Sequence, residues 1–315
     1  MAAGVGQKIE ASDYNSIQNK IAGILGTGSG TSGYGQPVTS ASVIVGEKVN
    51  LSGWLNLRAD LRAAREHQLG TGTVSTGSET AGATNLLIPA TSLVITEALR
   101  NQYDLFADVV ISNKWLLGTP GQYSTETVLT YSKSGAWNGT IANVVTISGN
   151  AGGAGTAENM RFFFNAGGSF SIQASRNGPS AGSKDDTWTT TLSQSAVVTM
   201  NHTTTTYSGS NGTVYNVGYD SLTTSDQTIF WKAAPAGNYS ENDYYIYARK
   251  SANGADVIFT LQFQDDDTGD RTGLGPAVDE NVNAAGGTLD TSITMIRPSG
   301  SNVSILSPTS SQTGM

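Results

Sequence analysis

The sequence predicts an α+β protein, with a helical N-terminal region followed by a mainly antiparallel, β-sandwich-like domain. Residues 1–118 carry apolar side chains at helical spacing, whereas residues 119–315 contain short β-type runs between Gly, Asn and Ser turns. The length of 315 residues allows one large domain or two smaller ones. We therefore predict a docking or assembly region over residues 1–118 and a β-sandwich-like domain over residues 119–315.

Three helices are expected in the N-terminal region, at residues 13–25, at residues 53–69, and from Thr96 or Glu97 onward. Apolar residues recur on one face of each helix. A serine before each of the first two helices can cap the free N–H groups, and a glycine after each can end it. These residues are Ser12 and Gly26 for the first helix, and Ser52 and Gly70 for the second. Residues 38–49 are expected to include a short strand.

The segment from Arg161 to Arg176 is predicted to be a β-hairpin. Phe162 to Phe164 form an apolar run, residues 165–168 read Asn-Ala-Gly-Gly, and apolar residues then alternate with Ser and Gln. Glycine tolerates the positive φ of a tight turn, and alternation is typical of a strand with one buried face. Other expected strands are 126–132, 141–148, 196–200, 228–232, 244–249, 256–264 and 291–297. The clearest buried face is that of Val257, Phe259, Leu261 and Phe263.

Composition limits the functions open to the chain. The formal net charge of -8 disfavours non-specific nucleic-acid binding, which needs a positive field. The absence of cysteine excludes disulfides, thiol catalysis and Cys-ligated metals. No apolar run approaches the roughly 18 residues of a membrane span, and the N-terminus has no apolar signal-peptide core, so we expect no membrane insertion and no signal peptide. Charged residues are 13% of the chain, about half the usual share, which favours close packing of copies.

Two glycine motifs match known signatures but lack the structural context that those signatures need. Residues 28–33 match GxGxxG, yet a helix rather than a strand precedes them, so a glycine-rich loop is the better interpretation. Residues 178–182 match GxSxG, with Ser180 at the nucleophile position and His202 as the one later histidine, but the surroundings indicate a surface loop. We expect no catalytic residue, although paired carboxylates from distant segments stay open.

The two histidines, His67 and His202, have no metal-ligand spacing, and structural roles are expected for both. His67 falls in the last turn of a helix, where the helix dipole favours a positive charge. The acidic cluster of residues 265–270 is an oxygen-rich loop with a glycine, and its spacing makes Asp265, Asp267 and Asp270 candidate calcium ligands. A solvated turn is the alternative, and no other cofactor is expected.

Two features indicate contacts with other molecules. Arg58, Arg62 and Arg65 form a stripe along the second helix, which is either a solvated or salt-bridged face or a contact with another copy of this acidic chain. The glycine-rich residues 26–37 are a second candidate for contact between copies, as a loop lying against another backbone. Trp231 and the tyrosines within residues 239–247 form either core packing or an exposed platform for sugars or proteins.

Several stretches resemble virion structural proteins of large contractile-tailed (T-even-like) cyanophages and related marine phages. They are residues 11–40 and 54–70, and in the β region MRFFFNAGGSFSI, DQTIFWKA at 226–233 and VIFTLQFQDDD at 257–267. The resemblance implies a particle component without a catalytic motif. We therefore expect a non-enzymatic structural protein of the virion, in the tail, neck, fibre or capsid exterior, with itself and other virion proteins as partners. The alternative is a glycan-binding or adhesin module that contacts the host surface.

Overall fold

The computed structural model describes residues 10–44, 46–70, 79–81, 84–86, 97–118, 121–149, 158–178, 183–267, 281–282 and 286–314. The chain divides into two units. The helical unit comprises Met1–Ser124, Arg161–Gly168 and Arg297–Ile305, and the β unit comprises Thr125–Met160, Ser169–Ile296 and Leu306–Met315. The first helical segment therefore ends close to the predicted boundary at residue 118, and two later segments complete that unit.

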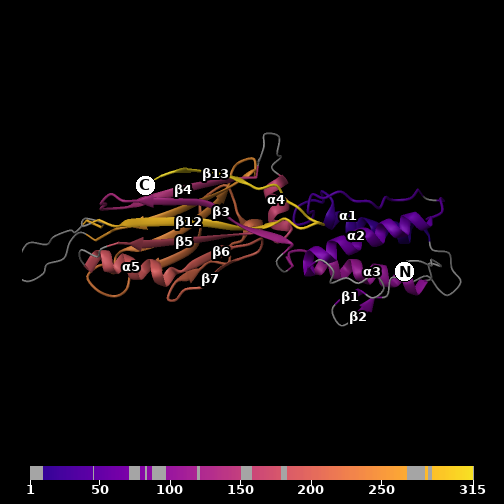
Figure 1. The fold of residues 1–315 in the computed structure, drawn as a ribbon, viewed down its shortest axis with the longest axis horizontal. Helices are drawn as coiled ribbons and strands as arrows, with labels where there is room; N and C mark the ends of the chain where they lie inside the picture. The colour runs from indigo at the N-terminus through magenta and orange to yellow at the C-terminus, as the bar shows by residue number, and fades with distance from the viewer. Residues whose placement is uncertain are drawn as a thin grey trace, which may run out of the picture. The chain divides into compact units, whose positions relative to one another are not determined.

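The helical unit is built on α1 (Ala11–Leu25), α2 (Leu51–Leu69) and α3 (Glu97–Ser112), which lie side by side (Figure 1). Tyr14, Trp54 and Tyr103 supply one aromatic side chain from each helix, and successive ring centroids are 5.2 Å apart in edge-on contacts. All three side chains are buried, so they form the centre of this core. The short strands β1 (Glu79–Ala81) and β2 (Thr84–Leu86) pair antiparallel in the same unit.

The predicted capping residues of α1 and α2 are confirmed at the C-terminal ends, whereas other residues cap the N-terminal ends. Gly26 and Gly70 stand at the C-caps of α1 and α2, as predicted. Glu10, rather than Ser12, is the N-cap of α1 and forms a capping box with Asp13. In α2 the cap is Asn50, whose side-chain oxygen accepts a hydrogen bond from the Gly53 N–H at 2.8 Å.

The strand expected within residues 38–49 is wrong for the part of that segment that the structure describes. The backbone there is bound by a side chain instead of by another strand. The Asp60 carboxylate, on α2, accepts hydrogen bonds from the Thr39 N–H at 3.0 Å and from the Ser40 N–H at 2.8 Å. Because these donors are already satisfied, the segment has no need of a β ladder.

The predicted hairpin over residues 161–176 is wrong in its first half, which is helix α4 (Glu158–Asn165). The turn glycines end this helix instead of joining two strands. Gly167 has φ +89°, its N–H donates to the Phe164 carbonyl, and the Gly168 N–H donates to the Phe163 carbonyl. A glycine with positive φ serves a helix end and a hairpin turn equally well, and this explains the error. The second half is a strand, as predicted.

The β unit contains two antiparallel sheets, the α-helix α5 (Ser183–Ser195), which was not predicted, and the short 3-10 helix η1 (Tyr219–Ser221). The strands are β3 (Tyr123–Lys133), β4 (Ile141–Ser148), β5 (Ser169–Asn177), β6 (Val197–Met200), β7 (Thr205–Tyr207), β8 (Thr213–Val214), β9 (Gln227–Ala233), β10 (Asp243–Lys250), β11 (Asp256–Gln264), β12 (Thr288–Pro298) and β13 (Thr309–Thr313). One sheet has the order β13-β4-β11-β10-β9-β8. The other sheet, whose strands are labelled in Figure 1, has the order β3-β12-β5-β6-β7. The predicted α+β class with sandwich-like sheets is confirmed.

The core of the β unit lies between the inner faces of the two sheets. The four residues predicted to share one face of β11, Val257, Phe259, Leu261 and Phe263, are all fully buried. Phe259 contacts Phe170 of β5 in the other sheet, with ring centroids 5.9 Å apart. The period-2 alternation therefore identified the central strand and its inward face correctly. Among the described residues, no helix is long and apolar enough to cross a membrane.

Candidate functional site: an aromatic face on the six-stranded sheet

The outer face of the six-stranded sheet carries three aromatic side chains that we call the aromatic face: Trp231 of β9, and Tyr245 and Tyr247 of β10. Trp231 and Tyr245 are register partners across the two strands. The Trp231 and Tyr245 rings stack at 6.5 Å and 28°, and the Tyr245 and Tyr247 rings stack at 5.6 Å and 11°. The three rings form a continuous, partly exposed row.

Asp243 holds two of these rings in place. Its Oδ1 accepts a hydrogen bond from Trp231 Nε1 at 2.9 Å, and its Oδ2 accepts one from the Tyr245 hydroxyl at 3.2 Å. Burial, together with the nearby Asp243 carboxylate, raises the pKa of Tyr245 to about 12. The hydroxyl therefore remains protonated near neutral pH and is a hydrogen-bond donor. Rings fixed by a carboxylate lose little rotamer freedom when a ligand binds.

The predicted platform of Trp231 and residues 239–247 divides between the surface and the interior. Tyr244 points inward and stacks on Phe263 at 5.0 Å. Tyr239 is also buried, and the Lys184 ammonium lies over its ring. Strand alternation separates Tyr245 and Tyr247 from Tyr244. The core interpretation therefore applies to Tyr239 and Tyr244, whereas the platform for sugars or proteins stays a prediction for the partly exposed rings.

The acidic loop after β11 has a cation from the chain itself. Lys184 Nζ lies 2.9 Å from Asp265 Oδ1 and 3.4 Å from Asp267 Oδ2. Asp270, the third candidate calcium ligand, lies outside the described residues, so the calcium site stays a prediction. In the described part of the chain, no group of three His, Cys, Asp or Glu residues is arranged to hold a metal.

Both histidines are buried, as structural roles require. His67 Nε2 lies 2.8 Å from the Ala166 carbonyl, to which it must donate, and burial lowers its pKa to about 4. The imidazole is therefore neutral near pH 7, and the expected stabilisation of a positive charge by the helix dipole does not apply. His202 lies between β6 and β7, where its ring faces Tyr219 at 6.4 Å.

The arginine stripe of α2 is largely engaged within the helical unit. Arg62 forms an ion pair with Glu66 at 2.9 Å, and buried Arg65 donates to Gln68 at 3.1 Å. Arg58 also interacts within the chain. The stripe therefore corresponds to the salt-bridged alternative more closely than to an open docking surface.

Side chains of α4 hold the glycine-rich loop of residues 26–37 by hydrogen bonds, although α4 lies far from the loop in the sequence. Arg161 donates to the carbonyls of Gly30 and Ser32, and Asn165 donates to those of Ser32 and Gly33. Gly33 has φ +96°, and an added Cβ would lie 2.2 Å from the Thr27 carbonyl oxygen. Two side chains of α4 therefore hold the loop within the unit, and its role as a contact between copies stays a prediction. Of the GxSxG motif, residues 179–182 lie outside the described residues.

Two polar features were not found from the sequence. A shallow depression on the five-stranded sheet is lined by Thr130, Tyr131, Ser132, Gln173, Ser175, Asp290, Thr291 and Ser292. Lys184 was overlooked because its helix has an unusual Ser- and Thr-rich sequence, SKDDTWTTTLSQS. A lysine just before two acidic residues gave no signal that it would be buried.

Known proteins give no identification. No protein-family model, no curated protein and no solved structure matches this chain.

Proposed function

We propose that this chain is a non-enzymatic structural protein of a tailed-phage particle, in the tail, neck, fibre or capsid exterior, and that it self-associates through its helical unit. The resemblance to virion structural proteins supports the proposal, because the similar residues 11–40 and 54–70 form α1, the glycine-rich loop and α2 of one packed unit. The low charged fraction of 13% is compatible with close contact between copies.

The observation that carries the proposal is the exposed apolar surface of the helical unit. Leu51 and Leu55 are 52% and 37% exposed, and their i, i+4 spacing places them side by side on the first turns of α2. Ile44, shortly before α2, is 71% exposed. Leu105, Trp115 and Leu116 of the same unit are also exposed. An adjacent exposed pair such as Leu51 and Leu55 is suited to a protein–protein contact.

The native mass of the purified full chain, measured by light scattering on a sizing column, tests the proposal. We expect a discrete oligomer or a filament rather than a single copy of 32.7 kDa. The double variant Leu51→Ser/Leu55→Ser removes exposed apolar surface without touching the core, so it should shift the mass towards the monomer.

Leu306→Ser is the matched control, because Leu306 is 62% exposed but belongs to the β unit. It should leave the mass unchanged. A wild-type monomer at all concentrations would refute self-association. An oligomer that the Leu51/Leu55 variant leaves intact would refute this contact.

A second candidate function is glycan binding by the aromatic face, as in an adhesin. Stacked, partly exposed aromatic rings beside a carboxylate fit the apolar face and the hydroxyl groups of a sugar. Trp231, Tyr245 and Asp243 supply these elements on one rigid sheet. The two functions are compatible, because a fibre can both build the particle and contact the host.

Glycan-array binding of the full chain tests this second function. If the face binds sugars, Trp231→Ala and Tyr245→Ala should each weaken binding about tenfold or more, since a buried aromatic anchor contributes ~1.4 kcal/mol or more. Tyr123→Ala, at the start of β3 in the five-stranded sheet, is the control and should bind as the wild type does. Absence of binding to any host-surface sugar would count against the adhesin function.

A further inference from the structure

Lys184, Asp265 and Asp267 form a buried charged triad in the β unit. The side chains of the three residues are 1%, 0% and 5% exposed, and the ammonium lies within 3.4 Å of an oxygen of each carboxylate. Asp265 and Asp267 are buried and both contact Lys184, while Asp266 between them is exposed. One cation and two carboxylates are thus held together away from water.

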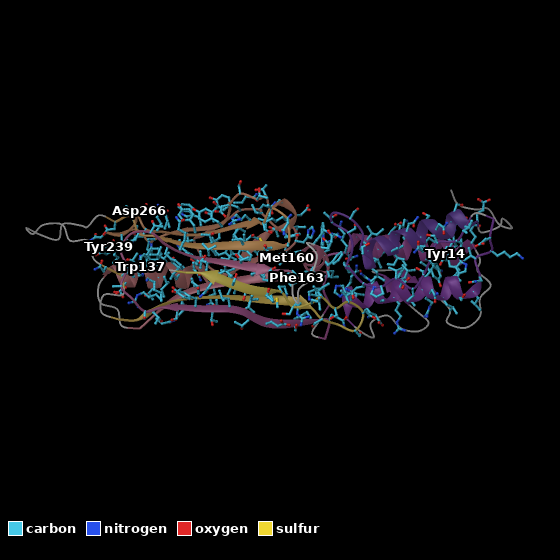
Figure 2. The ribbon with its side chains drawn as sticks, turned by 90° about the horizontal axis from the view of Figure 1, so that it is seen from above. Tyr14, Trp137, Met160, Phe163, Tyr239 and Asp266 are labelled. Carbon is cyan, nitrogen blue, oxygen red and sulfur yellow. The ribbon has the colours of Figure 1, made fainter. Side chains whose placement is uncertain are left out.

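Tyr239 lies against the triad, and further aromatic side chains come from positions close to Lys184 and Asp265 in the sequence. Trp188 is one turn after Lys184 on α5, and its ring lies 5.2 Å from Trp137 and 6.0 Å from Phe263. The Tyr239 ring lies 6.0 Å from Lys184 Nζ. Figure 2 shows Trp137, Tyr239 and Asp266 at the same end of the β unit. Charges in such an environment are costly, and a reaction that removes two of them is favoured.

We propose that Lys184 and Asp265 condense to an intramolecular isopeptide bond, with Asp267 as the proton-transfer group. Lysine is a nucleophile when its amine is neutral and desolvated. Amide formation in solution needs an activated carboxylic acid. Here the fold holds the amine and the carboxyl group in contact, and two groups held in this way react as if each were present at very high concentration. Lys184 Nζ is already at 2.9 Å from Asp265 Oδ1, and a small approach brings it to Cγ.

The step balances without any further reagent. Asp267 takes a proton from the ammonium and passes it to an Asp265 oxygen, and the amine then attacks Asp265 Cγ. The Nζ–Cγ bond forms and the Cγ–Oδ bond to the protonated Asp265 oxygen breaks. Asp267 takes a second proton from Nζ and gives it to the departing oxygen, which leaves as water. Asp267 ends in its starting state, as expected of a general acid–base. One positive and one negative charge disappear, and one carboxylate remains.

The chain offers an internal comparison in Lys20, which also contacts two carboxylates. Lys20 Nζ lies 2.7 Å from Asp104 and 2.6 Å from Asp108, but these side chains are 28%, 38% and 55% exposed. Although partial burial lowers the pKa of Lys20, hydrogen bonds to Asp104 and Asp108 raise it on balance, so the ammonium is retained. Contact alone is therefore not sufficient, and no bond is expected at Lys20.

Intact mass spectrometry of the purified full chain, followed by tryptic mapping, tests the proposal. We expect a mass lower by one water than the sequence requires. We also expect no cleavage after Lys184, and a branched peptide joining residues 177–232 to residues 251–271 through Lys184 and Asp265. The map should show Lys20 without a link. The full sequence mass with separate peptides, also after prolonged incubation at neutral pH, would overturn the proposal.

Two variants separate the roles within the triad. Lys184→Arg keeps the positive charge but should restore the full mass. Asp267→Asn keeps the shape of the proton-transfer group but should slow or abolish bond formation, and the unlinked chain should migrate differently on a denaturing gel. A link from Lys184 to Asp267, or undiminished linkage in Asp267→Asn, would overturn the assignment of these roles. Circular dichroism of each variant establishes that the β unit remains folded.

Discussion

Lowering the pH from 7 to 4 is expected to remove about 3 kcal/mol of unfolding free energy through His67 alone. Burial lowers the pKa of His67 to about 4 in the folded chain, against 6.5 for an unperturbed histidine. The unfolded chain therefore binds the proton first. The stability due to neutral His67 is complete above pH 6.5 and is lost as the pH falls towards 4.

His67→Gln isolates this contribution, because a glutamine amide can replace the donor to the Ala166 carbonyl but does not titrate. Urea unfolding of both proteins at pH 7 and pH 4 measures the change, and hydrogen exchange of α2 amides locates it. Between pH 7 and pH 4 the free energy of unfolding should fall by about 3 kcal/mol less in the variant than in the wild type. Equal losses in both proteins would show that His67 is not the group responsible.

Asp185→Ala is expected to destabilise the β unit by about 3–5 kcal/mol, since it leaves a buried guanidinium without its carboxylate. Arg176 Nε lies 2.7 Å from Asp185 Oδ1, and the two side chains are 1% and 3% exposed. The same guanidinium donates to the carbonyls of Asn177 and Gly286, so it cannot easily leave its site. Urea unfolding followed by tryptophan fluorescence measures the effect, and a Lys184→Arg background removes any covalent link from the comparison.

Two controls test whether burial of the Arg176–Asp185 ion pair causes the expected loss of stability. Asp108→Ala breaks the exposed ion pair with Lys20 and should cost only ~0–1 kcal/mol. Replacing both members of the buried pair, as Arg176→Met with Asp185→Leu, should recover much of the loss, because no unpaired charge then remains. A loss in Asp185→Ala as small as that in Asp108→Ala would contradict the argument.

The sequence predicts an element of the fold reliably where its residues follow a single hydrophobic pattern. Strand β11 alternates strictly, and its bounds and inward face were predicted correctly. α5 was missed because threonine and serine have weak helix propensity. In the structure Trp188 and Leu192 are buried from one face of α5, and the hydroxyls of Thr189 and Thr191 donate to carbonyls four residues earlier. Tertiary packing thus supports a helix that the local sequence does not specify.

The candidate sites show the same limit. Alternation along a strand predicts that Tyr245 and Tyr247 share one face of β10. The hydrogen bond from Trp231 to Asp243 depends instead on strand pairing, which no single sequence reveals. The acidic cluster was visible, whereas its partner Lys184 lies in another element. Charge patterns along a chain indicate candidates, but they do not show which charges meet.

The helical unit has a consequence for synthesis on the ribosome, because its parts are far apart in the chain. Asn165 fastens the glycine-rich loop, and Asn302 donates to Glu66 while Ser304 donates to Gln36. The helices α1 and α2 therefore lack part of their native contacts until residues 161–168 and 297–305 have been translated. Most strands of the β unit precede residues 297–305 in the chain, so the helical unit is completed only after most of the β unit has been translated.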